Sequence, residues 1–562
     1  MPNLLIKVLF FFNFTSKIKT FLFGLSNLIL SFLEVIGLSM LIPLLVVLFQ
    51  TEQPVSNDYL KNFSLIISNN FSTNIIIFFL FFIFLFKSFF YLFLINWKLK
   101  FINQISILIS KKLLTNYLNG NQEYFNKKNS GELLRNVINE NNKVIKALSS
   151  AADLLIDLTL LFVALIFLIF VNFQATITIF IFLSLFTFFY FLFLKKWLLR
   201  IANKNIYLMS DALKFLVESF RGYSEIFINN KQNFFINRYI DKDKLILKYK
   251  RYGGLIKVLP RTLLELIIIA IVLYFLLSFS SFEKNLNNIF FNLTIYGAVF
   301  FRLYPSIGKS IANLQNIISG KPSLNLIYDE INKVEKEFIN KKQIILPEDY
   351  QIESINLKNV SFCYENNKTI FNNINKKIKK SSIIGITGDS GVGKTTLIHL
   401  LSGILKPVEG EILVDEYNLG NLNNWTDKIA YVSQKPFIMD SSIRENVCLG
   451  DKLDTIGEKK LNDIYSLAGL DNFIENLKLK DLSQLGESGN LVSGGQIQRI
   501  GIARALYKKA QIFLLDEITS NLDENVKIKI LQNLIDLKSG RIIFLISHDK
   551  KILEYCDDFI NL

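Results

Sequence analysis

The chain contains the stretch Gly388-Asp389-Ser390-Gly391-Val392-Gly393-Lys394-Thr395-Thr396, which fits the phosphate-binding pattern G-x-x-x-x-G-K-[ST]. Residues 382–387 before it are apolar, as in a buried strand, and residues 396–401 after it are typical of a helix. Glycines let backbone N–H groups turn toward phosphate oxygens, and a helix N-terminus and Lys394 add positive charge. Thr395 offers a hydroxyl to Mg²⁺. The stretch therefore predicts a loop that binds ATP with Mg²⁺, although a transporter, a kinase and a GTPase all remain compatible with it.

The length and the composition of the chain indicate more than one domain. A chain of 562 residues is too long for a single core. Up to about residue 310 the sequence is rich in Phe, Leu and Ile in runs of roughly 20 residues, the length of a membrane span. Beyond residue 326, short apolar runs alternate with polar turns. We therefore expect a transmembrane domain at residues 1–325, a charged linker at 326–350 and a nucleotide-binding domain at 351–562.

Charge and cysteine content narrow the expected partners and compartment. The formal net charge is +15, but no compact Lys/Arg patch with interleaved aromatic residues occurs, so nucleic acid is not an expected partner. The basic residues concentrate in the connections that we expect on the cytoplasmic side of a membrane. Cys363, Cys448 and Cys556 have neither metal-binding nor redox spacing, which is typical of a reducing cytosol without disulfides.

The apolar runs predict six membrane spans and an interfacial helix. The run at residues 4–12 is too short to cross a bilayer and is typical of a helix on the membrane surface. Lysine and arginine crowd the connections 98–146 and 195–257, so these connections are expected in the cytosol, where helices extend beyond the membrane. The six spans are predicted at residues 21–49, 74–96, 152–171, 173–194, 261–279 and 288–307.

Four ionisable residues, Glu34, Lys87, Glu265 and Arg302, fall in or near these spans. A charge facing lipid is costly, so each should face the protein interior or a wet cavity. The residues could pair with one another across helices or contact a substrate, and for Lys87 pairing is the favoured alternative. The planar fork of Arg302 suits phosphate oxygens.

The C-terminal half contains two further features of nucleotide chemistry. An alternating strand at residues 355–362 leads to Tyr364, which could stack on adenine or serve as an ordinary strand aromatic. The apolar strand at 512–515 ends in Asp516 and Glu517. One carboxylate would hold Mg²⁺ through water and the other would orient the attacking water, although such a pair could also cap a helix.

Between these features lies Leu491-Val492-Ser493-Gly494-Gly495-Gln496-Ile497-Gln498-Arg499, which resembles the signature motif of ATP-binding cassette (ABC) proteins. The other marks of that family follow in order: Gln434 in Tyr431-Val432-Ser433-Gln434, Asp523 in Ser520-Asn521-Leu522-Asp523, and His548 in Ile546-Ser547-His548. Val492 in place of Leu and Asn521 in place of Ala depart mildly from the family pattern.

The resemblance implies an α-helical six-span transmembrane domain followed by an α/β P-loop nucleotide-binding domain, the architecture of an ABC exporter. It implies that two such domains pair head to tail, with each ATP between Lys394 of one and Ser493, Gly494 and Gly495 of the other. It also implies that Glu517 is the catalytic carboxylate and that His548 contacts the γ-phosphate. By the same resemblance, Asp516 and Gln434 help to hold Mg²⁺. His399 lies on the expected helix after the phosphate loop with no acidic partner in view, so we expect a structural role for it.

Six spans before one cassette resemble a half-transporter that acts as a homodimer. Residues 218–226 resemble the second cytoplasmic coupling segment of such exporters, and residues 129–133 resemble the stretch after the first. ATP binding would close the cassettes and switch the membrane cavity outward, and hydrolysis would reset it.

Three membrane segments, 33–43, 259–261 and 301–306, are similar to the lipid-linked oligosaccharide flippases of bacterial protein N-glycosylation. This similarity implies an amphipathic, polyprenyl-diphosphate-linked sugar as cargo, with Arg302, Arg261 and Glu34 as candidate contacts. It places the chain in the cytoplasmic membrane of a bacterium, among membrane lipids and with its nucleotide-binding domain in the cytosol. Export of drugs, lipids or peptides is the alternative, and a membrane regulator that uses ATP only as a switch is a second one. The six spans argue against a soluble cassette ATPase.

Overall fold

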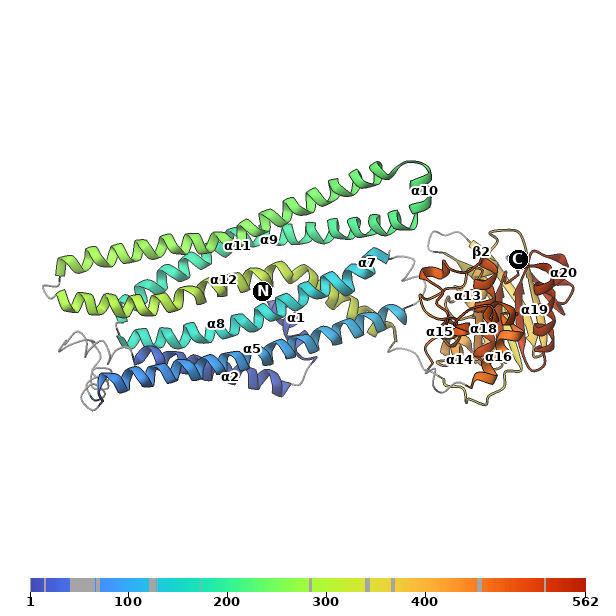
Figure 1. The fold of residues 1–562 in the computed structure, drawn as a ribbon, viewed down its shortest axis with the longest axis horizontal. Helices are drawn as coiled ribbons and strands as arrows, with labels where there is room; N and C mark the ends of the chain where they lie inside the picture. The colour runs from blue at the N-terminus through green and yellow to red at the C-terminus, as the bar shows by residue number, and fades with distance from the viewer. Residues whose placement is uncertain are drawn as a thin grey trace. The chain divides into compact units, whose positions relative to one another are not determined.

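The computed structural model describes residues 2–14, 17–40, 66, 71–120, 128, 130–171, 173–282, 286–338, 344–364, 369–451, 457–519 and 522–562. The chain divides into two compact units, with the change between Glu337 and Phe338. The first unit consists of helices, and the described strands belong to the second (Figure 1). The division falls inside the predicted linker at 326–350, most of whose first half continues the last helix of the first unit.

The helical unit is built mainly from very long helices. Several of them have 46 to 53 residues, or roughly 70–80 Å at about 1.5 Å per residue, which is more than twice the ~30 Å apolar core of a bilayer. A π-helical turn, Arg135–Glu140, separates α7 from α8. The helices are α1 (Pro2–Phe12), α2 (Lys17–Ser39), α5 (Thr73–Leu118), α7 (Ser130–Leu134), α8 (Asn141–Val171), α9 (Phe173–Arg221), α10 (Tyr223–Ile228), α11 (Gln232–Phe282) and α12 (Leu286–Phe338).

Within the described residues, three helices are long and apolar enough to cross a membrane: Ile18–Gly37, Asn74–Leu118 and Gly131–Phe170. They overlap the first three predicted spans, although residues 41–49 of the first span lie outside the described part. The other three predicted spans fall within α9, α11 and α12, where many side chains lie outside the description.

The extensions of these helices pack through apolar residues at helical spacing. On α5, Ile105, Ile109 and Leu113 recur every four residues, and each is fully buried. Helices α9 and α11 run side by side and are joined through the short helix α10, which follows Gly222 (Figure 1). The stretch 218–226, which resembles a coupling segment, therefore contains the start of a short separate helix.

The second unit contains two sheets. The four-stranded antiparallel sheet has the order β2-β1-β4-β5, and the five-stranded parallel sheet has the order β6-β7-β8-β3-β9. The strands are β1 (Ser354–Cys363), β2 (Thr369–Lys379), β3 (Ser382–Thr387), β4 (Glu409–Val414), β5 (Tyr417–Asn418), β6 (Ile429–Val432), β7 (Ile512–Asp516), β8 (Ile542–Ile546) and β9 (Asp558–Asn561). The helices are α13 (Lys394–Leu401), α14 (Trp425–Lys428), α15 (Ile443–Cys448), α16 (Glu458–Leu467), α17 (Asp471–Glu475), α18 (Gly494–Tyr507), α19 (Glu524–Asp536) and α20 (Lys550–Leu553).

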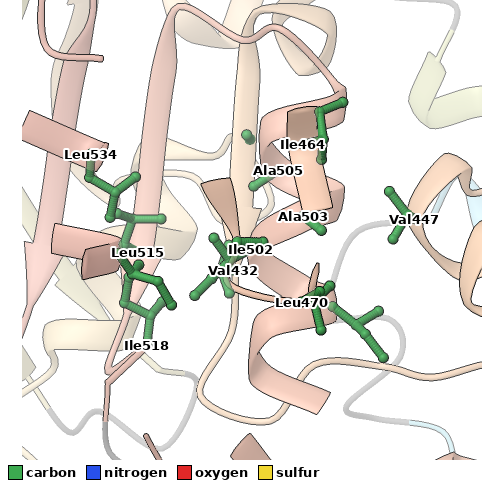
Figure 2. Close-up of a cluster of buried hydrophobic side chains, with 14 of the residues drawn as sticks. Val432, Val447, Ile464, Leu470, Ile502, Ala503, Ala505, Leu515, Ile518 and Leu534 are labelled. Carbon is green, nitrogen blue, oxygen red and sulfur yellow. The ribbon is translucent and has the colours of Figure 1, made fainter. Parts of the chain in front are cut away.

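Continuous apolar runs explain why β7 and β8 lie at the centre of the parallel sheet. Every residue of both strands is buried, as expected for strands covered on both faces. They pair in parallel from Ile512 with Ile542 to Asp516 with Ile546. Figure 2 shows part of the core on one face of this sheet, where Val432, Ile502 and Leu515 come together with residues of the covering helices.

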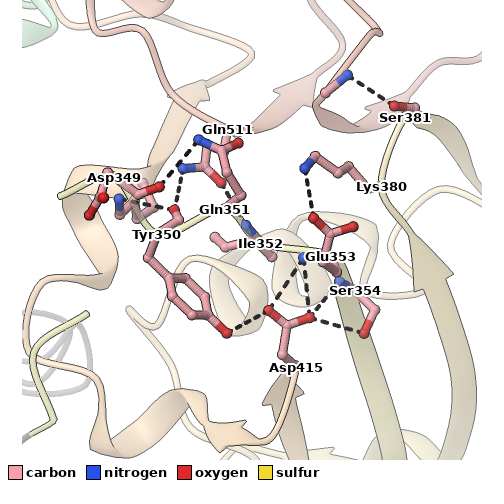
Figure 3. Close-up of polar contacts among 12 residues, drawn as sticks. Asp349, Tyr350, Gln351, Ile352, Glu353, Ser354, Lys380, Ser381, Asp415 and Gln511 are labelled. Carbon is pink, nitrogen blue, oxygen red and sulfur yellow. Dashed lines mark hydrogen bonds and ion pairs between the residues drawn. The ribbon is translucent and has the colours of Figure 1, made fainter. Parts of the chain in front are cut away.

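A polar network fixes the beginning of the second unit (Figure 3). The carboxylate of Asp415 accepts hydrogen bonds from the Ser354 backbone N–H at 2.7 Å and from the Tyr350 hydroxyl at 2.9 Å. The Gln511 side chain accepts from the Ile352 N–H at 2.9 Å and donates to the Tyr350 carbonyl at 2.7 Å. These bonds attach the segment before β1 to the turn between β4 and β5, through Asp415, and to the start of β7, through Gln511.

Candidate nucleotide site

The phosphate-binding stretch lies between β3 and α13, as its pattern requires. Gly388, Gly391 and Gly393 have φ values of 143°, 83° and 116°, which residues other than glycine rarely adopt. A Cβ on Gly393 would lie 2.2 Å from the Cγ2 of Ile370, so this position has no room for one. The loop thus turns its backbone toward the N-terminus of α13, which is a suitable place for a phosphate.

Lys394 is held inside this loop. Its buried Nζ donates hydrogen bonds to the carbonyl oxygens of Gly388, at 2.8 Å, and Asp389, at 3.2 Å. The Asp389 carbonyl also accepts from the Val392 N–H, at 3.3 Å, which closes the turn around the exposed Ser390. The ammonium therefore lies over the hollow of the loop, where it would meet the phosphates of a nucleotide.

Two of the three predicted ligands of Mg²⁺, Thr395 and Asp516, contact each other directly, whereas the third, Gln434, contacts Glu517. The Thr395 hydroxyl donates to Asp516 Oδ2 at 2.9 Å, joining the start of α13 to the end of β7. Burial and the neighbouring Glu517 raise the pKa of Asp516, although Thr395 and Lys394 oppose the shift. A divalent cation would relieve this unfavourable burial of charge, and the hard oxygen donors fit Mg²⁺. The described residues hold no group of three or more His, Cys, Asp or Glu around one point, so the phosphates and water would complete the coordination.

Three residues predicted to act in hydrolysis meet at the carboxyl edge of the parallel sheet. Gln434 Nε2 donates to Glu517 Oε2 at 2.6 Å, and His548 Nε2 lies 3.2 Å from Glu517 Oε1. Gln434 follows β6, Glu517 follows β7 and His548 follows β8. Because parallel strands place their carboxyl ends together, residues from three distant segments form one cluster beside the phosphate loop.

The backbone also holds Glu517 in place. Its φ of 49° is left-handed, which is uncommon for a residue other than glycine. Its N–H donates to the Ile546 carbonyl at 3.1 Å, and its own carbonyl accepts from Gln498 Nε2 at 3.0 Å. No sequence motif predicts a role for Gln498. The available signal was a polar residue on the otherwise apolar buried face of α18, where Gln498 is fully buried.

Two ring-bearing residues singled out from the sequence, Tyr364 and His399, lie on or close to α13. The Tyr364 hydroxyl is 3.1 Å from Thr396 Oγ1, and its ring packs edge-on against Phe362. Tyr364 therefore lies beside the first turn of α13 with more than a third of its surface exposed, at 38%, which leaves the ring accessible to a base. Burial lowers the pKa of His399, whose Nε2 is 3.5 Å from the Tyr431 hydroxyl, a setting that suits the structural role predicted for it.

The signature residues form a separate hollow of about 450 Å³. Ser493 caps α18: its hydroxyl accepts from the Gln496 N–H at 3.3 Å, and the Gln496 side chain accepts from the Ser493 N–H at 2.8 Å. Its described lining includes Asp523 together with Ser493, Gly494 and Gly495. It includes no residue of the phosphate loop. The phosphate loop and the signature residues thus lie in two separate places of the same domain. Ser520 and Asn521 lie outside the described residues.

The candidate substrate residues of the membrane unit are only partly visible. Glu34 is almost fully buried and its Oε2 lies 2.6 Å from Lys87 Nζ. These two residues therefore form an ion pair across helices, which was one of the two alternatives for the charged residues of the spans. Glu265 accepts a hydrogen bond from the Tyr304 hydroxyl at 2.7 Å. Arg261 and Arg302 lie on α11 and α12, but their side chains lie outside the described part of the structure.

Glu34 and Lys87 line a cavity of about 720 Å³ among α2, α5, α8 and α12. A second ion pair on its wall joins Lys98 Nζ to Asp153 Oδ1 at 2.6 Å. Asp157 accepts from Ser306 at 3.3 Å and from Asn313 at 3.2 Å. With Lys309, the described wall carries three lysines and three carboxylates.

Comparisons with known proteins agree with this geometry. Residues 371–520 match the family model described as ABC transporter. The chain is 34% identical over 253 residues to a probable ABC transporter ATP-binding/permease protein of Haemophilus influenzae, covering 44% of each chain. It is 32% identical over 247 residues to a multidrug resistance ABC transporter ATP-binding and permease protein of Lactococcus lactis, covering 42% of each. It is 36% identical over 259 residues to the pediocin PA-1 transport/processing ATP-binding protein of Pediococcus acidilactici, covering 44% of this chain and 35% of that one.

These alignments span less than half of the curated relatives, but the fold is similar over almost the whole chain. A bacterial Atm1-family ABC exporter with ATP bound superposes with a TM-score of 0.80, covering 96% of this chain and 92% of the other at 17% identity. The predicted fold class, a helical transmembrane domain with an α/β nucleotide-binding domain, is confirmed. The chain thus has the fold of an ABC exporter, and residues 371–520 of its second unit match the ABC transporter family model.

Proposed function

We propose that the chain is an ATP-driven half-transporter that works as a homodimer in the cytoplasmic membrane of a bacterium. Two incomplete nucleotide half-sites in one domain support the dimer, because the hollow of Ser493 and Asp523 lacks the phosphate loop that would complete it. In that dimer each ATP would lie between Lys394 of one protomer and Ser493 of the other.

The residues of the site have distinct roles in hydrolysis. The P-loop backbone and Lys394 hold the phosphates, and Thr395 with Asp516 holds Mg²⁺, which neutralises charge that develops on the phosphates. Glu517 orients the attacking water and accepts its proton, while Gln434 and His548 keep the carboxylate directed toward that water. Without the two neighbours, the side chain of Glu517 would sample several rotamers.

The cargo is an amphipathic lipid with a charged head group, and we propose a polyprenyl-diphosphate oligosaccharide. The observation that carries this proposal is the 720 Å³ cavity of the membrane unit, whose wall holds paired charges. Its size is within the usual range of ligand pockets, and its lysines could exchange their carboxylate partners for diphosphate oxygens. The short similarities to lipid-linked oligosaccharide flippases and the position of Arg302 support the same cargo.

A multidrug or peptide exporter is the second candidate, favoured by the relatives from Lactococcus and Pediococcus. An ATP-dependent regulator without transport is a third. A translocation assay separates them. Purified chain in vesicles should move a fluorescent polyprenyl-diphosphate sugar only with ATP, and Arg302→Leu should abolish this movement while basal ATPase activity persists. Unchanged movement in Arg302→Leu would remove the residue from the mechanism, and no movement at all with ATPase activity intact would favour the other two functions.

A further inference from the structure

A second cavity of the membrane unit has a different character from the first. It measures about 340 Å³ and lies among α8, α9, α11 and α12. Of its described lining residues, four are lysines and none is an aspartate or a glutamate. We call it the basic pocket; the residues that line it are Lys143, Lys146, Leu198, Ile201, Ala202, Asn205, Tyr249, Lys250, Gly253, Gly254, Lys257, Asn316, Ser319, Gly320 and Ser323.

Most of the positive charge in the basic pocket is not neutralised. Lys143 lies 2.8 Å from Glu140 Oε1, and this buried carboxylate also accepts from Ser323 at 2.5 Å. Lys146, Lys250 and Lys257 form no ion pair with any described residue. Desolvation and the charge of Lys146 lower the pKa of Lys257, which lies outside the predicted spans. An anion between Lys146 and Lys257 would remove their mutual repulsion.

The pocket also offers space and polar groups. A Cβ on Gly254 would meet no atom within 4 Å, so the helix leaves open volume at this position. On α9, the lining residue Asn205 has a buried Oδ1 without a hydrogen-bond partner among the described residues. A half-turn of this amide exchanges its oxygen with its NH₂ group, which would then donate to an oxyanion. Helices α8 and α12 pack closely where they line the pocket. A Cβ on Gly320 would lie only 2.7 Å from the Cβ of Ala147, so this position has no room for a side chain.

The depth of the pocket identifies the kind of anion. On α9 and α11 the lining residues lie between 4 and 12 positions beyond the cytoplasmic ends of the spans predicted at 173–194 and 261–279. At about 1.5 Å per residue, this is roughly 6–18 Å from the apolar core, at and just beyond the level of the lipid head groups. Basic pockets between helices on the cytoplasmic side are suited to anionic head groups.

We infer that the basic pocket binds the phosphate group of an anionic lipid of the cytoplasmic leaflet, held by Lys146, Lys250 and Lys257. The inference uses the membrane orientation of the proposed function but not its cargo. Phosphate oxygens would accept from the three ammonium groups, while the acyl chains would follow the exposed apolar surface of α9 and α11 toward the membrane. The pocket and the charged cavity lined by Glu34 share none of their described lining residues.

The test measures binding of fluorescent phosphatidylglycerol to the purified full-length chain in neutral detergent, with phosphatidylcholine and inorganic phosphate as competitors. Lys146→Gln/Lys257→Gln should weaken binding about 10- to 30-fold, since each lysine near a lipid head group contributes about 1 kcal/mol. The matched control is Lys204→Gln/Lys248→Gln, which removes the same charge from exposed positions of α9 and α11 outside the pocket and should leave binding unchanged.

Gly254→Leu keeps all the lysines and fills the pocket, so it should abolish binding. It therefore tests the pocket independently if the double lysine variant folds poorly. Equal losses in the control and pocket variants would overturn the inference, because they would indicate attraction by net charge alone. Displacement of the lipid by inorganic phosphate at equal concentration would overturn the lipid as the occupant. Loss of phosphatidylglycerol binding with cargo-stimulated ATPase activity retained would support a lipid site separate from the proposed cargo.

Discussion

The side chain of Gln434 donates a hydrogen bond of 2.6 Å to the carboxylate of Glu517, although the two residues are 83 positions apart. The bond joins the segment after β6 to the end of β7, and His548 approaches the same carboxylate from the segment after β8. The carboxylate is therefore held by side chains that follow the two neighbouring strands. Such positioning matters because phosphoryl transfer depends on positioning and charge more than on covalent chemistry.

Glu517→Gln should reduce ATP hydrolysis by about 10²-fold or more, because an amide cannot accept the proton of the attacking water. ATP binding should remain, since the phosphate loop is untouched. Phosphate release and binding of a fluorescent ATP analogue measure the two effects. Glu554→Gln, at an exposed position of the same domain, serves as the control. Equal hydrolysis by Glu517→Gln and wild type would assign the proton transfer to another group.

Gln498→Leu should lower the turnover number more than it changes the Michaelis constant for ATP. The substitution keeps the approximate size of the side chain but leaves the buried carbonyl of Glu517 without its 3.0 Å donor. The loss of such a partner costs about 1–3 kcal/mol, part of which should appear as displacement of the carboxylate. Steady-state kinetics and thermal unfolding provide the measurement, with the exposed Gln351→Leu as control. A purely structural role for Gln498 would lower stability and leave the turnover number of the folded fraction intact.

Asp516→Asn should stabilise the nucleotide-free protein at neutral pH while it abolishes binding of Mg²⁺ with ATP. The pKa of Asp516 in the folded state is raised above its usual value of 3.8. The folded state therefore binds this proton more tightly than the unfolded state does. Stability is lost as pH rises from about the usual value through the raised pKa, and the loss persists above it. Unfolding temperatures measured from acid to neutral pH should show the advantage of the variant growing with pH; an advantage that is constant or shrinks would contradict this assignment.

Lys87→Met should destabilise the membrane unit by about 3–5 kcal/mol, because it leaves the carboxylate of Glu34 buried without its partner. Glu34→Gln/Lys87→Met should recover most of the stability, since no charge then remains at either position. Thermal unfolding of the two single variants and the double variant in detergent gives the coupling. If the stability losses of the two single variants add up to that of the double variant, the two residues act independently.

The positions of the candidate nucleotide-site residues in the fold could be predicted from the sequence because they follow local rules. A glycine loop between a strand and a helix, and carboxylates at the end of an apolar strand, determine where Lys394, Asp516 and Glu517 lie relative to a parallel sheet. Gln498 could not be assigned in this way, because its partner is a backbone carbonyl whose position depends on the left-handed φ of Glu517.

The membrane unit was less predictable from sequence. Hydropathy locates spans but does not fix how the helices rotate against one another. The pairing of Glu34 with Lys87 was therefore one of several possibilities until α2 and α5 were placed. The basic pocket was even less predictable from sequence, because Lys146 and Lys257 are 111 positions apart and belong to different helices. Their proximity follows from the packing of α8 and α11 around the pocket, which hydropathy does not fix.

The most direct test of the proposed function is the ATPase activity of the purified full-length chain in lipid vesicles. The activity is measured alone, with polyprenyl-diphosphate sugars and with a panel of hydrophobic drugs, and Glu517→Gln gives the background. We expect stimulation by the diphosphate lipids that is absent with the drugs. Stimulation by drugs alone would contradict the lipid-linked cargo and assign the chain to multidrug export.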